Sequence, residues 1–100
     1  YGAKNLYHVV IDNEAYESTG GQPTTSASVD FEKAALACGY KGAQTVSSPQ
    51  DVENAVKEMK TKEGPYMLIV KVDKGARKDL GRPTTTPIEN KKAFMEFLGK

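Results

Sequence analysis

The sequence predicts an α/β fold of three layers, in which helices cover both faces of a parallel sheet of about three strands. Segments rich in β-branched and aromatic residues alternate with segments whose apolar residues recur at helical spacing. The resulting order is β-α-β-α-β-α, in which each helix returns the chain so that the strands run parallel. The 100 residues are 38% hydrophobic and 27% charged, as in an ordinary globular domain. We expect residues 1–100 to form a single α/β domain.

The first predicted strand is NLYHVVID, residues 5–12. It is apolar almost throughout, a pattern typical of a strand that is covered on both faces. His8 lies within it, and the chain has no second histidine that would complete a metal site. We therefore interpret His8 as a core or edge residue whose ring is satisfied by a neighbouring group.

The first predicted helix lies within SVDFEKAALACGY, residues 28–40, and Gly39 is placed to end it. Four of its apolar side chains follow helical spacing and are expected to face the sheet. They are Phe31, Ala34, Ala35 and Cys38. Cys38 is accordingly interpreted as a small core residue rather than a reactive thiol.

The second strand is predicted at residues 42–48, and the helix that follows has the clearest start signal in the chain. Ser48 is a natural N-cap, Pro49 suits the first turn, and Asp51 is placed to complete a capping box. Gly64 ends this helical segment.

The third strand is predicted at residues 66–73, and an irregular segment, 74–85, leads to a last helix. Thr86 precedes that helix, and Glu89 follows three residues later. Three strands are few for such a sheet and leave an edge open for pairing. Since the chain also begins at Tyr1 without methionine, we expect it to be a segment of a longer protein.

Composition excludes several classes of function. Fourteen basic and thirteen acidic residues give a net charge of +1, without a basic face for nucleic acid. No apolar run approaches the roughly 18–20 residues of a membrane span. The single cysteine allows neither a disulfide within the chain nor a cysteine-based zinc site. These features predict a soluble, cytoplasmic protein.

Two irregular segments, 12–28 and 74–85, each follow a strand, so both should lie at the sheet edge where ligands of parallel sheets bind. The first is longer than the usual connection, which indicates either a functional loop or a merely solvated one. It offers oxygen ligands suited to magnesium or calcium and an exposed backbone suited to an anion. These groups are Asp12, Asn13, Glu14 and Glu17, and then Ser18, Thr19, Gly20 and Gly21.

The second irregular segment is basic. It is either a solvated loop or an electropositive lip for an anionic substrate. Its cations are Lys74, Arg77, Lys78 and Arg82, against one acid, Asp79.

At these two segments the sequence resembles a known family. NLYHVVIDNEAYESTGGQPT, residues 5–24, resembles the end of the thiamine diphosphate signature of thiamine-dependent decarboxylases. STGGQPT, residues 18–24, and DLGRPTTTPIENK, residues 79–91, resemble the phosphonopyruvate decarboxylases among them. The resemblance implies the C-terminal part of the diphosphate-binding domain of a thiamine diphosphate-binding fold, with thiamine diphosphate and Mg²⁺ as cofactors.

The resemblance also implies roles for individual residues. The Asn13 side chain and the Ala15 carbonyl would ligate magnesium, Glu14 and Tyr16 would line the cofactor, and Ser18 and Thr19 are a guess for substrate contacts. No residue here is assigned a catalytic role. The Gly-Asp-Gly of the family, and its catalytic glutamate on the partner pyrimidine-binding domain, have no counterpart in the chain. The isolated chain is therefore expected to be inactive and its parent to be an oligomer.

Two positions depart from the family pattern. Glu14 stands where the family commonly has glycine, and a left-handed backbone there would be strained. Tyr16 stands where the family has histidine, and a phenol is no acid or base near neutral pH.

The activity that the resemblance implies is conversion of phosphonopyruvate to phosphonoacetaldehyde and carbon dioxide, with the thiazolium ring as electron sink. Two alternatives remain open. One is a segment of a sulfopyruvate decarboxylase, which differs in the anion recognised. The other is a non-catalytic α/β module that binds an anion or a partner at its open sheet edge.

Overall fold

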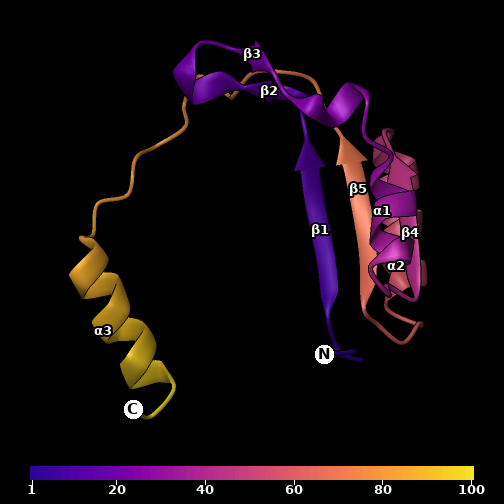
Figure 1. Cartoon of the computed structure of the whole chain (residues 1–100). Helices are drawn as coiled ribbons and strands as arrows, with labels where there is room; N and C mark the ends of the chain where they lie inside the picture. Colours follow the sequence, from indigo (N-terminus) through magenta and orange to yellow (C-terminus); the bar gives the residue numbers. More distant parts are fainter.

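The computed structural model describes all 100 residues and confirms the predicted α/β order. Its elements run along the chain as follows (Figure 1): β1 (Tyr7–Asp12), β2 (Ala15–Tyr16), η1 (Glu17–Thr19), β3 (Gln22–Pro23), η2 (Thr25–Ala27), α1 (Phe31–Ala37), β4 (Gly42–Val46), α2 (Pro49–Met59), β5 (Tyr66–Lys71) and α3 (Pro87–Phe97). η1 and η2 are single 3₁₀ turns. None of the helices has both the length and the apolar content that a bilayer crossing requires.

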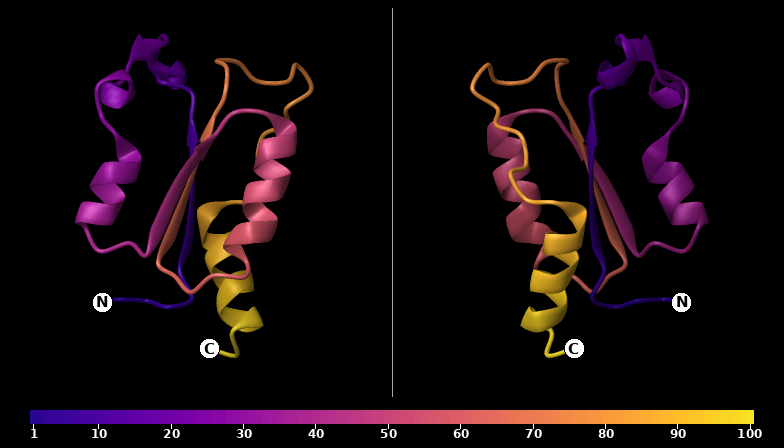
Figure 2. Two further views of the ribbon diagram at one scale, coloured as in Figure 1. Left: turned by 90° about the vertical axis from the view of Figure 1, so that its right-hand side faces the viewer. Right: turned by 90° about the vertical axis from the view of Figure 1, so that its left-hand side faces the viewer.

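The main sheet has three parallel strands in the order β1-β5-β4. β5 is central and the most buried, and Leu68 and Ile69 are almost fully enclosed. α1 lies on one face of the sheet and α2 on the other (Figure 2), which gives the predicted three layers. The core between α2 and the sheet consists of Val46, Ala55, Met59, Tyr66, Leu68 and Val70.

β1 differs from its prediction. It is an edge strand, and its face on the α2 side is uncovered. Val9 is 47% exposed and Ile11 is 65% exposed. The physical reason is that α2 packs against β4 and β5, so the apolar side chains of β1 on that side have no cover. His8 was interpreted as a core or edge residue whose ring is satisfied by a neighbour. The structure confirms this, since His8 lies on this edge strand with its Nδ1 3.0 Å from the Tyr40 hydroxyl.

Cys38 also differs from its prediction, because it is exposed. α1 has seven residues and ends at Ala37, so the last position of the predicted apolar stripe falls on the C-cap. Gly39 then turns the chain away with a φ of 91°, in the left-handed region that favours glycine. Only Ala35 of that stripe is fully buried.

Both predicted helix starts are present, but the capping box predicted at Ser48 is incomplete, because the Asp51 carboxylate bonds to the Ser48 hydroxyl and not to the Ser48 amide. Ser48 Oγ accepts a hydrogen bond from the Asp51 amide at 3.1 Å, and it donates to the Asp51 carboxylate at 2.6 Å. At α3 the capping box is complete: Thr86 Oγ1 accepts from the Glu89 amide, and Glu89 accepts from the Thr86 amide. Caps of this kind satisfy amides that have no partner within the helix.

α3 stands apart from the sheet, beyond the β1 edge (Figure 1), on the same side as α2 (Figure 2). All of its residues are exposed, including Ile88, Phe94 and Phe97. The radius of gyration is 16.8 Å, whereas a compact chain of this length has about 13 Å. α3 is therefore maintained by local interactions, chiefly its cap.

We expect the helicity of α3 to fall in acid. Hydrogen bonds from the Thr86 amide and hydroxyl hold the pKa of Glu89 below its ordinary value of 4.5. A carboxyl with a lowered pKa stabilises the helix above its unfolded pKa, and the contribution disappears as the pH falls through the lowered value. Carbon-13 Cα shifts of residues 87–97 should stay helical from pH 7 to about 5 and lose helical character below about 4.

Glu89→Gln provides the control for this titration. The amide lacks the carboxylate charge, so helicity at pH 7 should already be lower and should change little with pH. An acid transition of the same size in the variant would contradict the role of Glu89.

Candidate active site

The candidate site lies where β1 and β5 end side by side. Asp12 is in register with Lys71, so the segments that follow these strands start from neighbouring points. The segment after β1 leads to the α1 face, and the segment after β5 leads to the opposite face (Figure 2). Divergence of this kind opens a crevice at the carboxyl ends of parallel strands. The crevice contains a hollow lined by Asp12, Asn13, Glu14, Pro23, Lys71, Val72, Asp73 and Lys74.

The segment between β1 and α1 contains short regular elements, although most of its residues are exposed. β2 and β3 pair antiparallel as a small hairpin (Figure 1), with Ala15 opposite Pro23. Gly20 and Gly21 form its turn with φ of 117° and 78°, which other residues rarely adopt. The hairpin returns the chain beside β1, so that Ser26 comes to lie against Asp12.

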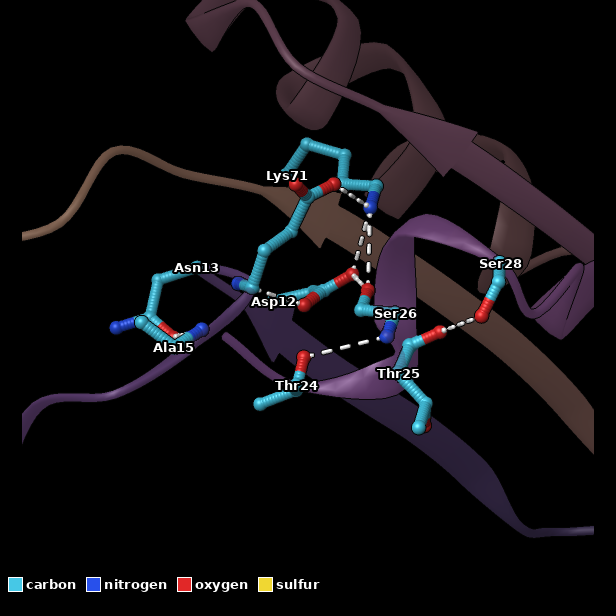
Figure 3. Close-up of polar contacts among 9 residues, drawn as sticks. Asp12, Asn13, Ala15, Thr24, Thr25, Ser26, Ser28 and Lys71 are labelled. Carbon is cyan, nitrogen blue, oxygen red and sulfur yellow. Dashed lines mark hydrogen bonds and ion pairs between the residues drawn. The ribbon is translucent and has the colours of Figure 1, made fainter. Parts of the chain in front are cut away.

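Asp12 and Lys71, which line the hollow, form a charged cluster with Ser26 (Figure 3). The Lys71 ammonium donates to Asp12 Oδ2 at 2.7 Å, and the Ser26 hydroxyl donates to the same oxygen. Asp12 is buried, with 8% of its surface exposed. Lys71 and Ser26 both lower the pKa of Asp12, while Asp12 and then Glu14 raise the pKa of Lys71. Both groups are therefore charged at neutral pH, and they tie β1 to β5.

Glu14 adopts the left-handed backbone that is strained for a residue other than glycine. Its φ is 56°, and it is the one residue other than glycine with a positive φ. Such a backbone costs roughly 1–2 kcal/mol for a residue with a Cβ. Two bonds offset this cost: the Glu14 amide donates to Asp12 Oδ1 at 3.0 Å, and Glu14 Oε1 accepts from Lys71 at 2.6 Å.

Asn13 is held in one orientation at the rim of the hollow. Its Oδ1 accepts from the Ala15 amide at 3.1 Å, and its Nδ2 donates to Glu17 Oε2 at 2.6 Å. An amide oxygen has two lone pairs, so one remains for a further partner. Figure 3 shows Asn13 and Ala15 together, next to the charged cluster.

These residues fit part of a magnesium site. An asparagine oxygen and a backbone carbonyl are the hard oxygen ligands that Mg²⁺ takes. The chain contains no group of three or more histidine, cysteine or carboxylate side chains placed to bind a metal. A metal at Asn13 would therefore complete its coordination with the cofactor and with ligands from outside these 100 residues.

The other proposed contact residues are not among those that line the hollow. Ala15 and Tyr16 form β2, while Ser18 and Thr19 belong to η1, and none of the four lines the hollow. Thr19 Oγ1 donates to Gln22 Oε1 at 3.0 Å, within the hairpin.

The basic segment after β5 reaches the hollow through Lys74. Arg77 lies 3.5 Å from Asp79 in an exposed ion pair. The amide of Gly75 donates to Glu17 Oε1 at 2.5 Å, which joins this segment to the one after β1.

Sequence reasoning missed Lys71 and Ser26. The sequence contains a signal for Lys71, since it is a lone cation at the end of an otherwise apolar strand. That strand pairs with the strand that ends in Asp12. Ser26 gave no local signal, since it becomes a partner of Asp12 only through the β2-β3 hairpin.

A family sequence profile, described as "Thiamine pyrophosphate enzyme, C-terminal TPP binding domain", matches residues 1–70 of this chain. The chain belongs to the thiamine pyrophosphate enzymes. Thiamine pyrophosphate is another name for thiamine diphosphate. The matched residues include β1, Asn13 and the β2-β3 hairpin. The resemblance expected from the sequence is thereby confirmed, as is the α/β fold.

Individual relatives within the thiamine pyrophosphate enzymes are decarboxylases. The chain is 37% identical over 94 residues to a phosphonopyruvate decarboxylase of Streptomyces viridochromogenes, covering 94% of the chain and 24% of the relative. It is 33% identical to a sulfopyruvate decarboxylase of Methanosarcina acetivorans, covering 95% of the chain and 24% of the relative. It is 28% identical to a sulfopyruvate decarboxylase subunit beta of Methanococcus maripaludis, covering 97% of the chain and 51% of the relative. The chain thus spans about a quarter of the length of the first two relatives.

Proposed function

We propose that this chain forms the diphosphate-binding side of a carboxy-lyase that depends on thiamine diphosphate and Mg²⁺ and converts phosphonopyruvate to phosphonoacetaldehyde and carbon dioxide. The observation that carries the proposal is Asn13, held by Ala15 and Glu17 at the rim of the hollow beyond β1. The phosphonate is supported by the 37% identity to a phosphonopyruvate decarboxylase and by the DLGRPTTTP stretch, residues 79–87.

In this proposal Asn13 Oδ1 and the Ala15 carbonyl would hold Mg²⁺, which would supply positive charge for the diphosphate of the cofactor. Glu14 and Tyr16 then line the cofactor. The charged cluster stabilises this arrangement, because the bond between Asp12 and Lys71 fixes the ends of β1 and β5 to each other and Ser26 also bonds Asp12. Since Lys71 is already paired with two carboxylates, it is not the cation that recognises the substrate.

The reaction breaks the bond between the carboxylate and the carbonyl carbon and adds a proton to that carbon. Bound thiamine diphosphate supplies the electron sink for this step. The proposed role of this chain in the reaction is to hold the metal and to attract the anionic substrate. Lys74 borders the hollow and is the cation best placed for the phosphonate, whose negative charge it would draw towards the site.

The remaining groups are proposed to lie outside these residues. The parts that carry the Gly-Asp-Gly and the pyrimidine-binding domain would complete the site, in an oligomer. One relative is named as a subunit, which supports assembly from separate parts. We call this chain together with those parts the assembled enzyme. The single cysteine is consistent with a reducing compartment, and we propose the cytoplasm.

A second candidate is decarboxylation of sulfopyruvate. It is favoured by two relatives whose names state that substrate, at 33% and 28% identity. Phosphonate and sulfonate have similar shapes and differ in charge, so the basic segment would decide between them.

Release of carbon dioxide by the assembled enzyme, with thiamine diphosphate and Mg²⁺, tests both candidates. We expect kcat/KM for phosphonopyruvate to exceed that for sulfopyruvate by about tenfold or more. The reverse preference would select the second candidate. If neither acid is cleaved although the cofactor binds, the chain serves as a binding module and the proposal fails.

A further inference from the structure

Glu17 connects the two irregular segments of the site through a single carboxylate. Its Oε2 accepts from Asn13 Nδ2 at 2.6 Å, and its Oε1 accepts from the Gly75 amide at 2.5 Å. Glu17 and Gly75 are 58 residues apart in the sequence. Both oxygens of the carboxylate are thus used, one on the segment after β1 and the other on the segment after β5.

The bond to Asn13 determines which end of the amide faces outward. The two ends of an asparagine amide are nearly equal in size but opposite in hydrogen bonding. Because Glu17 is an acceptor, it holds Nδ2, and Oδ1 is left for Ala15 and for a cation. Partners of this kind orient metal ligands in many proteins, and their loss typically lowers metal affinity by about 10–100-fold.

The bond to Gly75 depends on a backbone that glycine allows. Gly75 has a φ of 122°, which places its amide towards Glu17 and which a residue with a Cβ rarely adopts. The preceding residue, Lys74, lines the hollow. Holding the Gly75 amide therefore also positions the first cation of the basic segment at the hollow.

We infer that Glu17 is a positioning residue that couples the metal ligand Asn13 to the basic segment beginning at Lys74. This inference rests on the proposed function. Ordering Asn13 by a metal orders Glu17, and Glu17 in turn orders Gly75. Because coupling between sites is reciprocal, an anion held at the basic segment would also strengthen metal binding.

The test uses the assembled enzyme with thiamine diphosphate and with Mn²⁺ as the probe for Mg²⁺. Free Mn²⁺, measured by electron paramagnetic resonance, gives the metal dissociation constant. We expect Glu17→Ala to raise that constant about tenfold. Glu17→Gln should raise it less, because its single acceptor oxygen can still satisfy one of the two donors. Glu53→Ala is the matched control, since Glu53 is an exposed acid that pairs with Lys57 on α2.

Trypsin cleavage supplies a readout that a purely structural role would not change. We expect Mn²⁺ to slow cleavage after Lys74, Arg77 and Lys78 in the wild type, as identified by mass spectrometry. That protection should disappear in Glu17→Ala and weaken in Gly75→Ala, which strains the backbone at the bond. It should persist in Glu53→Ala.

The outcomes separate the two proposals. If the Glu17 variants bind Mn²⁺ within about twofold of the wild type, or keep the protection, the coupling is refuted while the proposed function stands. A wild type that binds neither Mn²⁺ nor thiamine diphosphate would refute the proposed function, and this inference with it.

Discussion

Asn13→Ala in the assembled enzyme is expected to lower kcat/KM for decarboxylation by about a hundredfold or more, with a matching loss of metal affinity. The substitution removes the side-chain oxygen that is oriented by Ala15 and Glu17 at the rim of the hollow. The backbone turn should persist, because the Glu14 amide remains bonded to Asp12. The measurements are carbon dioxide release and the Mn²⁺ dissociation constant.

A matched control is Asn54→Ala on α2. Asn54 is also an asparagine whose side chain bonds a neighbour, Gln50, but it lies on an exposed helix outside the hollow. Its replacement should leave activity and metal affinity unchanged. If Asn13→Ala retained wild-type values of both, Asn13 would not be a metal ligand.

Lys71→Met should lower the free energy of unfolding by about 3 kcal/mol. The reason is that Asp12 is buried and would keep its charge without its ammonium partner. Glu14 would also lose the bond that offsets its left-handed backbone. Urea denaturation of the chain, followed by far-ultraviolet circular dichroism, measures the change.

Two further variants test the cause of this loss. Lys57→Met also breaks a lysine–glutamate bond, but on the exposed surface of α2, and should cost less than about 1 kcal/mol. Asp12→Asn combined with Lys71→Met removes the buried charge as well, and should be more stable than Lys71→Met alone. Equal losses for Lys71→Met and Lys57→Met would show that burial of Asp12 is not the cause.

The parts of the fold that were predictable from the sequence are those decided by neighbouring residues. In the caps at Ser48 and Thr86, the hydroxyl accepts a hydrogen bond from the backbone amide three residues further on, so a short stretch of sequence contains the whole interaction. Exposure of β1 was not predictable in this way. The apolar residues of β1 predict that both faces of the strand are covered. Within this chain, however, α2 packs against β4 and β5 and leaves β1 without cover on that face.

The candidate site likewise has parts that depend on neighbouring residues and parts that depend on remote ones. A short motif places Asn13 at the end of the first strand and identifies Glu14 as a position where a left-handed backbone would be strained, and the structure shows such a backbone there. Their nearest partners are local, whereas the bonds that tie this turn to β5 and to the segment after it are remote: Lys71 is 57 residues from Glu14, and Gly75 is 58 residues from Glu17. A sequence pattern gives the register of neighbouring strands only after the topology is known, so these pairs required the structure.

The divergence of the two segments beyond β1 and β5 has a consequence for how such a protein changes over evolutionary time. The segment after β1 and the segment after β5 run to opposite faces of the sheet (Figure 2). Insertions or replacements beyond Gly75 can therefore accumulate while the turn around Asn13, and its link to Gly75 through Glu17, keep their geometry. Under the proposed function, such an architecture would let a lineage acquire a new acid as substrate without rebuilding the residues that hold the metal and cofactor.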